Sequence, residues 1–269
     1  MSRHREARQP RDPGERGRDP TGPVPFLDLA SVSHDEALRL LLASEITSVQ
    51  VVPAGSNYTF GALMSSNGRG QFMAIYKPRR GENPLWDFPE GTLHRREHAA
   101  YLTSRYLGWP NIPPTVIRDG PLGVGSVQLY VPTEEEWDFN QLRRRHREEL
   151  MRIALFDLLV NNADRKAGHC LLGRDGRIWS IDHGITFNMA PKLRTVLWDY
   201  CGEPIPEPLL AQLEPLRADP SRRRELQALL QPDLEPAEIE ATFRRLERIL
   251  HTRRYPQLDP HRNIPWPLV

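Results

Sequence analysis

The alternation of apolar and polar positions divides the chain into a first half of short strands and a second half of helices. Ordered structure is expected from about Phe26, where Ser33 and Glu36 form a capping-box pattern ahead of a short helix. A second helix is expected over 92–107, ended by Gly108. Strands are predicted over 46–53, 58–64, 71–76, 115–118 and 126–131. The first half is therefore a small sheet with one long helix.

Helical spacing dominates after Pro132. Leu150, Ile153 and Leu158 recur on one helical face and lead into a polar loop around Asp164. A hairpin closed by an Asp-Gly turn follows over 170–182. Two further helices are predicted over 222–230 and 236–251, and no internal repeat is evident. Strands followed by helices, rather than alternating with them, indicate an α+β fold.

Composition narrows the class of protein without identifying it. The 269 residues suffice for one large domain or two lobes, and 36 Lys and Arg against 35 Asp and Glu give no argument for a nucleic-acid or membrane partner. The two cysteines form no CxxC pair, which suits a reducing compartment. No apolar run reaches the roughly 18 residues that span a bilayer, and no signal peptide is evident. We predict a cytoplasmic protein with a disordered tail over 1–24.

The most informative pattern is a pair of acids on either side of the predicted hairpin. Asp164 lies in the loop after a helix, His169 follows five residues later, and Asp182 ends a strand before His183-Gly184. Kinases use this order for a carboxylate that orients the acceptor hydroxyl, a metal ligand and a second, acidic metal ligand. The alternative is structural, with one acid capping a turn and the other ending a strand. Arg165 either holds the loop or contacts phosphate.

His169 is the unusual member of this set. Most kinases have Asn at the first metal position, but neutral imidazole also binds divalent ions, and manganese accepts nitrogen more readily than magnesium does. A metal-dependent hydrolase using His169, Asp182 and His183 is a further alternative, although it lacks a third firm ligand.

Features of the first half fit a nucleotide site. Lys77 ends an apolar strand and Glu97 lies in the next helix, the order of the strand-lysine and helix-glutamate pair of kinases. Both also fit an exposed strand end and a solvated helix face. The strand over 126–131 offers backbone groups to an adenine ring. Between the first two strands, Gly55-Ser56-Asn57 is a short loop that either surrounds phosphate oxygens or is an ordinary hairpin turn.

Basic residues suggest where an acceptor binds. The run over 143–147 is expected to be a solvated stretch, with an anion site as the alternative. Lys192 and Arg194 follow Asp182 where a kinase has its activation segment, so they are the better acceptor-site candidates.

Taken together, these motifs resemble the phosphatidylinositol 3- and 4-kinase superfamily, most closely the type II phosphatidylinositol 4-kinases, in a bacterial, actinobacterial branch. The matching segments occur in the family's order over roughly 50–190. They are Gly55-Ser56, Ala74-Ile75-Tyr76-Lys77-Pro78, the segment 125–131, Asn162-Ala163-Asp164-Arg165 and Ile181-Asp182-His183-Gly184.

The resemblance implies a two-lobed protein-kinase-like fold with a small β-rich N-lobe over 25–131 and a mainly helical C-lobe over 132–269. It places ATP with Mg²⁺ or Mn²⁺ in the cleft. The implied roles are catalysis for Asp164 and Arg165, metal binding for His169 and Asp182, and nucleotide binding for Ser56, Asn57, Lys77, Glu97, Gln128, Tyr130 and Val131.

The chain departs from the family's pattern in three ways. Lys166 replaces the usual Gly, His169 replaces Asn, and the cysteine-rich, lipid-modified stretch of the type II enzymes is absent. Fold and ATP binding therefore carry over better than the lipid acceptor. The leading hypothesis is a kinase that phosphorylates a hydroxyl of a lipid headgroup, a small molecule or a protein. The alternative is a nucleotide-binding pseudokinase that acts as an interaction module.

Overall fold

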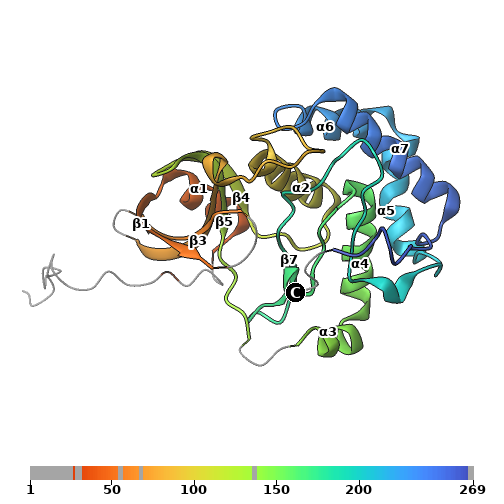
Figure 1. Cartoon of the computed structure of the whole chain (residues 1–269), viewed down its shortest axis with the longest axis horizontal. Helices are drawn as coiled ribbons and strands as arrows, with labels where there is room; N and C mark the ends of the chain where they lie inside the picture. The colour runs from red at the N-terminus through yellow and green to blue at the C-terminus, as the bar shows by residue number, and fades with distance from the viewer. Residues whose placement is uncertain (1–26, 28–31, 54–56, 67–68, 135–137, 266–269) are drawn as a thin grey trace, which may run out of the picture.

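The computed structural model describes residues 27, 32–53, 57–66, 69–134 and 138–265, so the predicted tail over 1–24 lies outside it. The described residues form two lobes, one built on an antiparallel sheet and a larger one built of helices (Figure 1). The smaller lobe contains α1 (His34–Ala43), β1 (Glu45–Val52), β2 (Thr59–Ser66), β3 (Gly70–Pro78), α2 (Leu93–Leu107), β4 (Thr115–Gly120) and β5 (Gly123–Leu129). The larger lobe contains α3 (Phe139–Arg145), α4 (Arg147–Val160), β6 (Cys170–Leu172), β7 (Ile178–Ser180), α5 (Glu207–Ala218), α6 (Pro220–Leu230) and α7 (Pro236–Thr252). This is the predicted α+β, two-lobed architecture.

The sheet of the smaller lobe has the order β1-β2-β3-β5-β4, with every neighbouring pair antiparallel. Along β3, burial alternates with a period of two. Phe72 and Tyr76 therefore pack into a core that includes Leu41 of α1, whereas Ile75 and Lys77 line a cavity on the other face. The pleat of one strand thus separates core-forming residues from cavity-lining residues.

Helix α2 connects the two lobes (Figure 1). It ends at Gly108, whose φ of 81° is the left-handed conformation that glycine adopts without strain. Ala99, Ala100 and Tyr101 belong to the hydrophobic core of the larger lobe rather than to the core under the sheet. Although α2 lies between strands in the sequence, its apolar face is therefore buried against the larger lobe.

The larger lobe packs around α4, and two of its helices were not predicted. Helix α3 begins at the Asp138 N-cap, whose side chain accepts the Gln141 N–H. Helix α5 contains Pro208 in its first turn and Pro215 in its interior, a sequence that argues against a helix. Its four leucines at 209, 210, 213 and 216 are buried in the core, and this burial outweighs the proline penalty.

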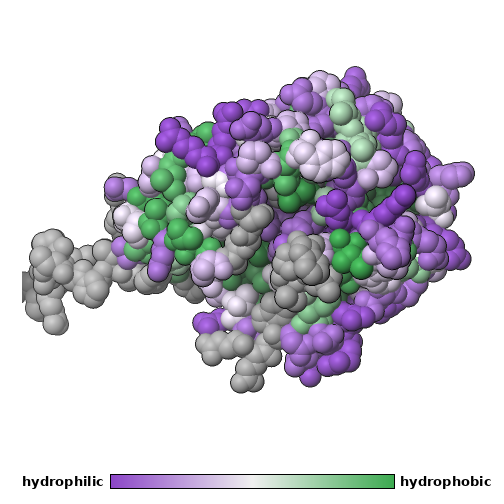
Figure 2. All heavy atoms as spheres, in the orientation of Figure 1, coloured by the Kyte–Doolittle hydropathy of each residue, from purple (hydrophilic) through white to green (hydrophobic). Residues whose placement is uncertain are grey.

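The two lobes differ at the surface. Figure 2 shows mainly hydrophilic side chains over α6 and α7 and a group of hydrophobic side chains over the smaller lobe. Val51 and Tyr58 are among the exposed apolar residues there. Cys170 and Cys201 are free thiols. Within the described ranges, no helix combines the length and apolar character needed to cross a membrane.

Candidate active site

Lys77 is held between two carboxylates at the end of β3. Its ammonium lies 2.8 Å from Glu97 Oε2 and 2.9 Å from Asp182 Oδ1. Burial by itself lowers the pKa of Lys77, but the charges of Asp182 and Glu97 outweigh burial and hold this pKa above its usual range. Lys77 is therefore a fixed cation that joins β3, α2 and the segment after β7.

Both oxygens of the buried Glu97 carboxylate have partners. Oε2 accepts from Lys77, and Oε1 accepts the backbone N–H of His183 at 3.1 Å. The carboxylate therefore fixes Lys77 and the residue after Asp182 at the same time. The sequence predicts the first of these contacts, whereas the second depends on the tertiary packing.

The neighbours of Glu97 on α2 anchor the helix to the larger lobe. Arg96 is almost completely buried and forms an ion pair with Glu238 of α7. His98 Nδ1 lies 2.6 Å from Asp233 Oδ2, just before α7. Because these contacts are buried or half-buried, they hold Glu97 where it pairs with the strand lysine.

Asp182 connects Lys77 to His169. Its φ is 58°, a left-handed conformation that Asp tolerates better than most residues but that still marks local strain. Oδ1 accepts from Lys77, and Oδ2 lies 3.2 Å from His169 Nε2. Burial raises the pKa of Asp182, but the nearby charge of Lys77 outweighs burial and holds this pKa well below its usual range. Asp182 is therefore an anion at all physiological pH values.

His169 is a neutral hydrogen-bond donor in this arrangement. Burial lowers its pKa to about 4, so its contact with Asp182 is a hydrogen bond rather than an ion pair. The backbone N–H of Lys166 points to Nδ1 at 3.4 Å, a long contact that favours the tautomer with the proton on Nε2. Nε2 binds a metal only after that proton moves to Nδ1. A proton on Nδ1 would then face the backbone N–H of Lys166, which is also a donor.

Asp164 lies in the loop after α4, where its backbone and side chain are both held. Its N–H donates to Asn162 Oδ1 at 2.9 Å, and its Oδ2 lies 3.1 Å from Lys166 Nζ. Burial raises the pKa of Asp164 to about 6, despite the opposing charge of Lys166. A carboxylate with this pKa is ionised at neutral pH and holds a proton more readily than an exposed aspartate.

These side chains meet at one cavity between the lobes, which we name the cleft. It encloses about 820 Å³ and is lined by Lys77 of β3, Asp164, His169 and Asp182 of the larger lobe, and Tyr130 of the connection between lobes. This volume lies within the roughly 300–1,000 Å³ typical of small-molecule sites. The structure therefore brings the predicted lysine, base and metal positions together.

Arg165 does not reach the cleft, which corrects its predicted place among the catalytic residues. Its side chain is fully buried, with Nε 2.7 Å from Asp157 Oδ2 and Nη2 2.8 Å from Asp157 Oδ1. Nη1 donates to the carbonyls of His169 and Ile181. Of the two roles left open, the guanidinium is placed to hold the loop and not to contact phosphate. It ties Asp164's loop to the strand that carries Asp182.

The predicted nucleotide side is only partly free. Gln128 lines the cleft, but its Nε2 donates to Thr115 Oγ1 at 2.8 Å and its backbone lies inside the sheet. Tyr130 N donates to Met73 O at 3.2 Å. This backbone N–H, one of the donors predicted to bind adenine, is therefore already used. Within the described ranges, the Val131 N–H has no backbone acceptor. Val131 therefore offers the clearest backbone donor to an incoming ring.

Of the predicted loop between β1 and β2, only the last residue can be placed. Ser56 lies outside the described residues. Asn57 lines the cleft, and its Oδ1 accepts the backbone N–H of Asn83 at 2.7 Å. Asn57 therefore braces the base of the loop against the chain that follows β3.

The basic residues predicted near the acceptor separate into two groups. Lys192 pairs with Asp87 at 2.7 Å and lies 4.6 Å from the centre of the exposed Trp86 ring, so its charge is already compensated. Arg194 lines the cleft, and its backbone is held by the loop that carries Asp164, with Arg194 N donating to Asn162 O. In the run over 143–147, the first and last arginines form exposed ion pairs with Asp199 and Glu203, as a solvated stretch does.

Two residues that position the site were not predicted. Asp157 lies in the apolar end of α4 and holds both Arg165 and Asn162 Nδ2. Asn161 ends α4 in a left-handed conformation and bonds to the backbone of the segment 188–192. The signal for Asp157 was an acid within the apolar run Leu155-Phe156-Asp157-Leu158-Leu159, where a lone charge requires a partner.

The donor set fits a metal only together with a ligand. Asp182 and His169 supply one carboxylate and one imidazole, and magnesium commonly takes one or two carboxylates plus phosphate oxygens. The described residues contain no group of three His, Cys, Asp or Glu that could hold an ion on its own. His183 is fully buried, and its Nε2 accepts from Arg165 Nη2. The hydrolase alternative therefore lacks its third ligand.

Comparison with known proteins identifies relatives of two kinds. Compared with protein-family models, the chain matches none. Protein Rv2133c of Mycobacterium tuberculosis (strain ATCC 25618 / H37Rv) is 37% identical over 274 residues, covering 89% of this chain and 98% of that protein. Phosphatidylinositol 4-kinase gamma 4 of Oryza sativa subsp. japonica is 30% identical over 151 residues, covering 49% of this chain and only 24% of the rice protein.

Similar solved structures support the fold. The structure of hydra Fam20 with sugar has a TM-score of 0.55 at 14% identity, covering 81% of this chain and 88% of that one. The Golgi casein kinase with Mn/ADP bound has a TM-score of 0.52 at 17% identity, covering 81% and 74%. These values show a kinase-like two-lobed fold, and they do not single out the predicted phosphatidylinositol 3- and 4-kinase superfamily. By sequence, the chain belongs to the same family as Protein Rv2133c.

Proposed function

We propose that the protein is an ATP-dependent phosphotransferase that transfers the γ-phosphoryl group to a hydroxyl. The observation that carries this proposal is the geometry of Lys77, which lies within 3 Å of both Glu97 and Asp182 while Asp164 lines the same cleft. Phosphoryl transfer depends mainly on positioning and on neutralising charge. Paired groups of both signs around one cavity provide these two elements, with the buried Glu97 fixing the half-buried Lys77.

Each residue has a distinct role in the proposed reaction. Lys77 contacts the nucleotide phosphates, and the N–H of Val131, which has no backbone acceptor among the described residues, donates to the adenine ring. Asp164 accepts the proton of the acceptor hydroxyl while the hydroxyl oxygen forms a bond to the γ-phosphorus. The bond between the γ-phosphorus and the oxygen that bridges it to the β-phosphate breaks, and ADP leaves. A pKa of about 6 keeps Asp164 ionised at neutral pH and still able to hold the transferred proton. Arg165 positions the loop that carries Asp164 through its buried contacts with Asp157 and with the carbonyls of His169 and Ile181.

A divalent ion, when bound with ATP, neutralises phosphate charge. Asp182 is the residue best suited to hold it, because its carboxylate is anionic and lines the cleft. His169 is the second proposed ligand and must first adopt its other tautomer. Two similar proteins support this proposal, since one is a phosphatidylinositol 4-kinase and another is a Golgi casein kinase with Mn/ADP bound.

The test is transfer of labelled phosphate from ATP in the presence of Mg²⁺ or Mn²⁺. Acceptors are offered in three separate pools: phosphatidylinositol vesicles, a metabolite extract and a denatured protein lysate. We expect label in one pool with the wild type and a loss of at least about a thousandfold in Asp164→Asn. Glu148→Gln, an exposed carboxylate on α4, is the matched control and should transfer normally. Equal transfer by Asp164→Asn, or none by the wild type, would exclude the proposed reaction.

A nucleotide-binding pseudokinase is the second candidate, and the tautomer of His169 is the observation that favours it. If His169 does not bind metal, ATP binds without productive geometry. ATP with Mn²⁺ should then raise the unfolding temperature of the wild type while no pool is labelled, because a ligand that binds only the folded state stabilises it.

Replacing His169 by Asn separates the two candidates. Asn supplies an oxygen, which magnesium prefers, so an active kinase should shift its preference from Mn²⁺ towards Mg²⁺. The measurement is the ratio of initial rates in the two metals for wild type and His169→Asn. An unchanged ratio would show that the imidazole is not a metal ligand.

A further inference from the structure

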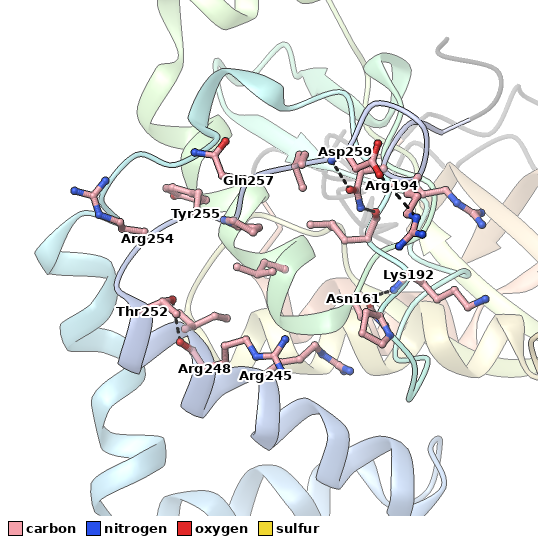
Figure 3. A pocket seen from close by; sticks show the side chains of 18 of the residues that line it. Asn161, Lys192, Arg194, Arg245, Arg248, Thr252, Arg254, Tyr255, Gln257 and Asp259 are labelled. Carbon is pink, nitrogen blue, oxygen red and sulfur yellow. Dashed lines mark hydrogen bonds and ion pairs between the residues drawn. The ribbon is translucent and has the colours of Figure 1, made fainter.

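A second cavity, larger than the cleft, lies in the helical lobe; we name it the basic cavity. It encloses about 1,070 Å³ between α7, the segment 189–194 and the segment after α7. Figure 3 shows Arg245 and Arg248 extending from α7 on one side, Lys192 and Arg194 on a second side, and Arg254 with Gln257 on a third. Side chains from three separate parts of the chain therefore surround one space.

The lining is strongly unbalanced in charge. It contains one carboxylate, Asp259, and the seven basic residues Lys192, Arg194, Arg244, Arg245, Arg248, Arg254 and Arg262. Two of the seven have acidic partners: Lys192 pairs with Asp87 outside the cavity, and Arg262 lies 3.8 Å from Asp259. The other five have no carboxylate within ion-pair distance among residues that the structure describes. The overall chain carries a formal net charge of only +1, so this concentration is local.

Arg245 shows how the protein maintains this charge. Its guanidinium donates to Leu159 O at 2.7 Å, Asn188 O at 3.1 Å and Thr242 Oγ1 at 2.8 Å, all of which are neutral acceptors. Burial and the neighbouring Arg244 lower the pKa of Arg245 to about 10. A largely buried cation without a counter-ion is costly. Arg245 is oriented by neutral groups, so its charge remains available to an external anion.

We propose that the basic cavity binds a small molecule carrying at least two phosphate groups. Guanidinium groups match phosphate oxygens in a planar, two-point geometry, and five of them are free of carboxylates. Arg244, Arg245 and Arg248 on α7 and Arg194 on the segment 189–194 border two sides of the space, and this placement fits separate anionic groups better than a single ion. The space is a concave hollow of about 1,070 Å³ rather than a flat surface, and a hollow suits a small molecule better than a planar membrane. Apolar walls from Leu158 and Met189 leave room for the uncharged part of the ligand.

The basic cavity adjoins the acceptor side of the cleft. Arg194 and Ile264 line both spaces. The backbone of Arg194 is held by the catalytic loop on both sides, because its N–H donates to Asn162 O and its carbonyl accepts from Arg165 N. A ligand in the basic cavity therefore contacts the same arginine that borders the space next to Asp164. Binding there does not depend on phosphotransfer, so it can be tested separately.

The test is calorimetric binding of inorganic tripolyphosphate to the full chain in EDTA, with inorganic phosphate and anionic vesicles as separate arms. Arg244 and Arg248 are exposed on α7, so Arg244→Glu/Arg248→Glu should fold normally. We expect it to lower tripolyphosphate affinity at least about thirtyfold, since two charge-assisted contacts are lost. Arg217→Glu/Arg224→Glu changes net charge equally on α5 and α6, away from the cavity, and should weaken binding less than about threefold.

Lys77→Met controls for binding in the cleft. Loss of tripolyphosphate binding in Lys77→Met but not in the α7 double variant would place the anion in the cleft and overturn the inference. Equal weakening by both arginine pairs would show a long-range charge effect and would also overturn it. Binding of vesicles without binding of tripolyphosphate would assign the arginines to a surface rather than to a small molecule. The thermal unfolding midpoint of each variant is recorded to exclude misfolding as the cause.

Discussion

The cleft and the basic cavity differ in how their charged side chains are compensated. In the cleft, Lys77 faces two carboxylates, and Arg165 is paired with Asp157 behind the loop. In the basic cavity, the Arg245 guanidinium is oriented by two carbonyls and a hydroxyl, and the lining contains one carboxylate. A balanced site is pre-organised, and removing one charge leaves its partner buried and unpaired. An unbalanced site gains from an external anion and loses little when a cation is removed.

The largest expected effect is on the balanced pair behind the cleft. Asp157→Ala leaves the fully buried Arg165 without a counter-ion, so the free energy of unfolding should fall by about 3–5 kcal/mol. Urea unfolding followed by circular dichroism measures this change. Asp157→Leu/Arg165→Met removes both charges and should recover most of the loss, because no charge is then stranded. A double variant as unstable as the single one would contradict the pairing argument.

Lys77→Met should reduce phosphoryl transfer by about a hundredfold to a thousandfold, the range seen when one pre-organised electrostatic contact is lost. It should also destabilise the fold, because Glu97 and Asp182 lose the cation between them. Initial rates and the unfolding midpoint are measured on the same preparation. Normal transfer by this variant would remove Lys77 from the catalytic set.

Asp164 connects activity with stability through its raised pKa. Its proton is bound more tightly in the folded state, so this carboxyl stabilises the fold below about pH 4 and that stabilisation is lost as pH rises through about 6. Asp164→Asn should therefore raise the free energy of unfolding by about 2 kcal/mol at pH 7.5 and by almost nothing at pH 3.5. Urea unfolding at the two pH values tests this, and an equal gain at both would contradict it. The wild-type transfer rate should fall below about pH 6, where the base becomes protonated.

The smallest expected effect concerns the unbalanced site. Arg244→Gln/Arg248→Gln should raise the free energy of unfolding by up to about 0.5 kcal/mol at low ionic strength, because repulsion within the basic cavity decreases. The gain should vanish at high salt, where exposed charges are screened. A loss of stability in this variant would mean that the two arginines have acidic partners after all.

The parts of the site that could be predicted from sequence are those that depend on local periodicity. The period of two in β3 places Lys77 on the opposite face of the sheet from Phe72 and Tyr76. The order of Lys77, Glu97, Asp164 and Asp182 along the chain can be read directly from the sequence. Helix α5 could not be predicted, because Pro215 in its interior opposes the helix and burial of its leucines is what favours it. The placement of Arg165 could not be predicted either, since a loop arginine has the same sequence signal whether it faces phosphate or a buried aspartate.

Strand alternation, loop position and residue type are local properties, so the sequence alone was enough to predict Lys77, Asp164, His169 and Asp182 as candidate site residues, all of which line the cleft. The change from period-two to helical patterning near Pro132 indicated the α+β class, and the family resemblance implied the two lobes. Only the tertiary structure decided how charges are paired. Glu97 reaches Lys77 and the backbone of His183 together, His169 receives a backbone N–H at Nδ1, and Arg194 borders two cavities. Pairing depends on distances between segments far apart in the chain, and no local pattern encodes those distances.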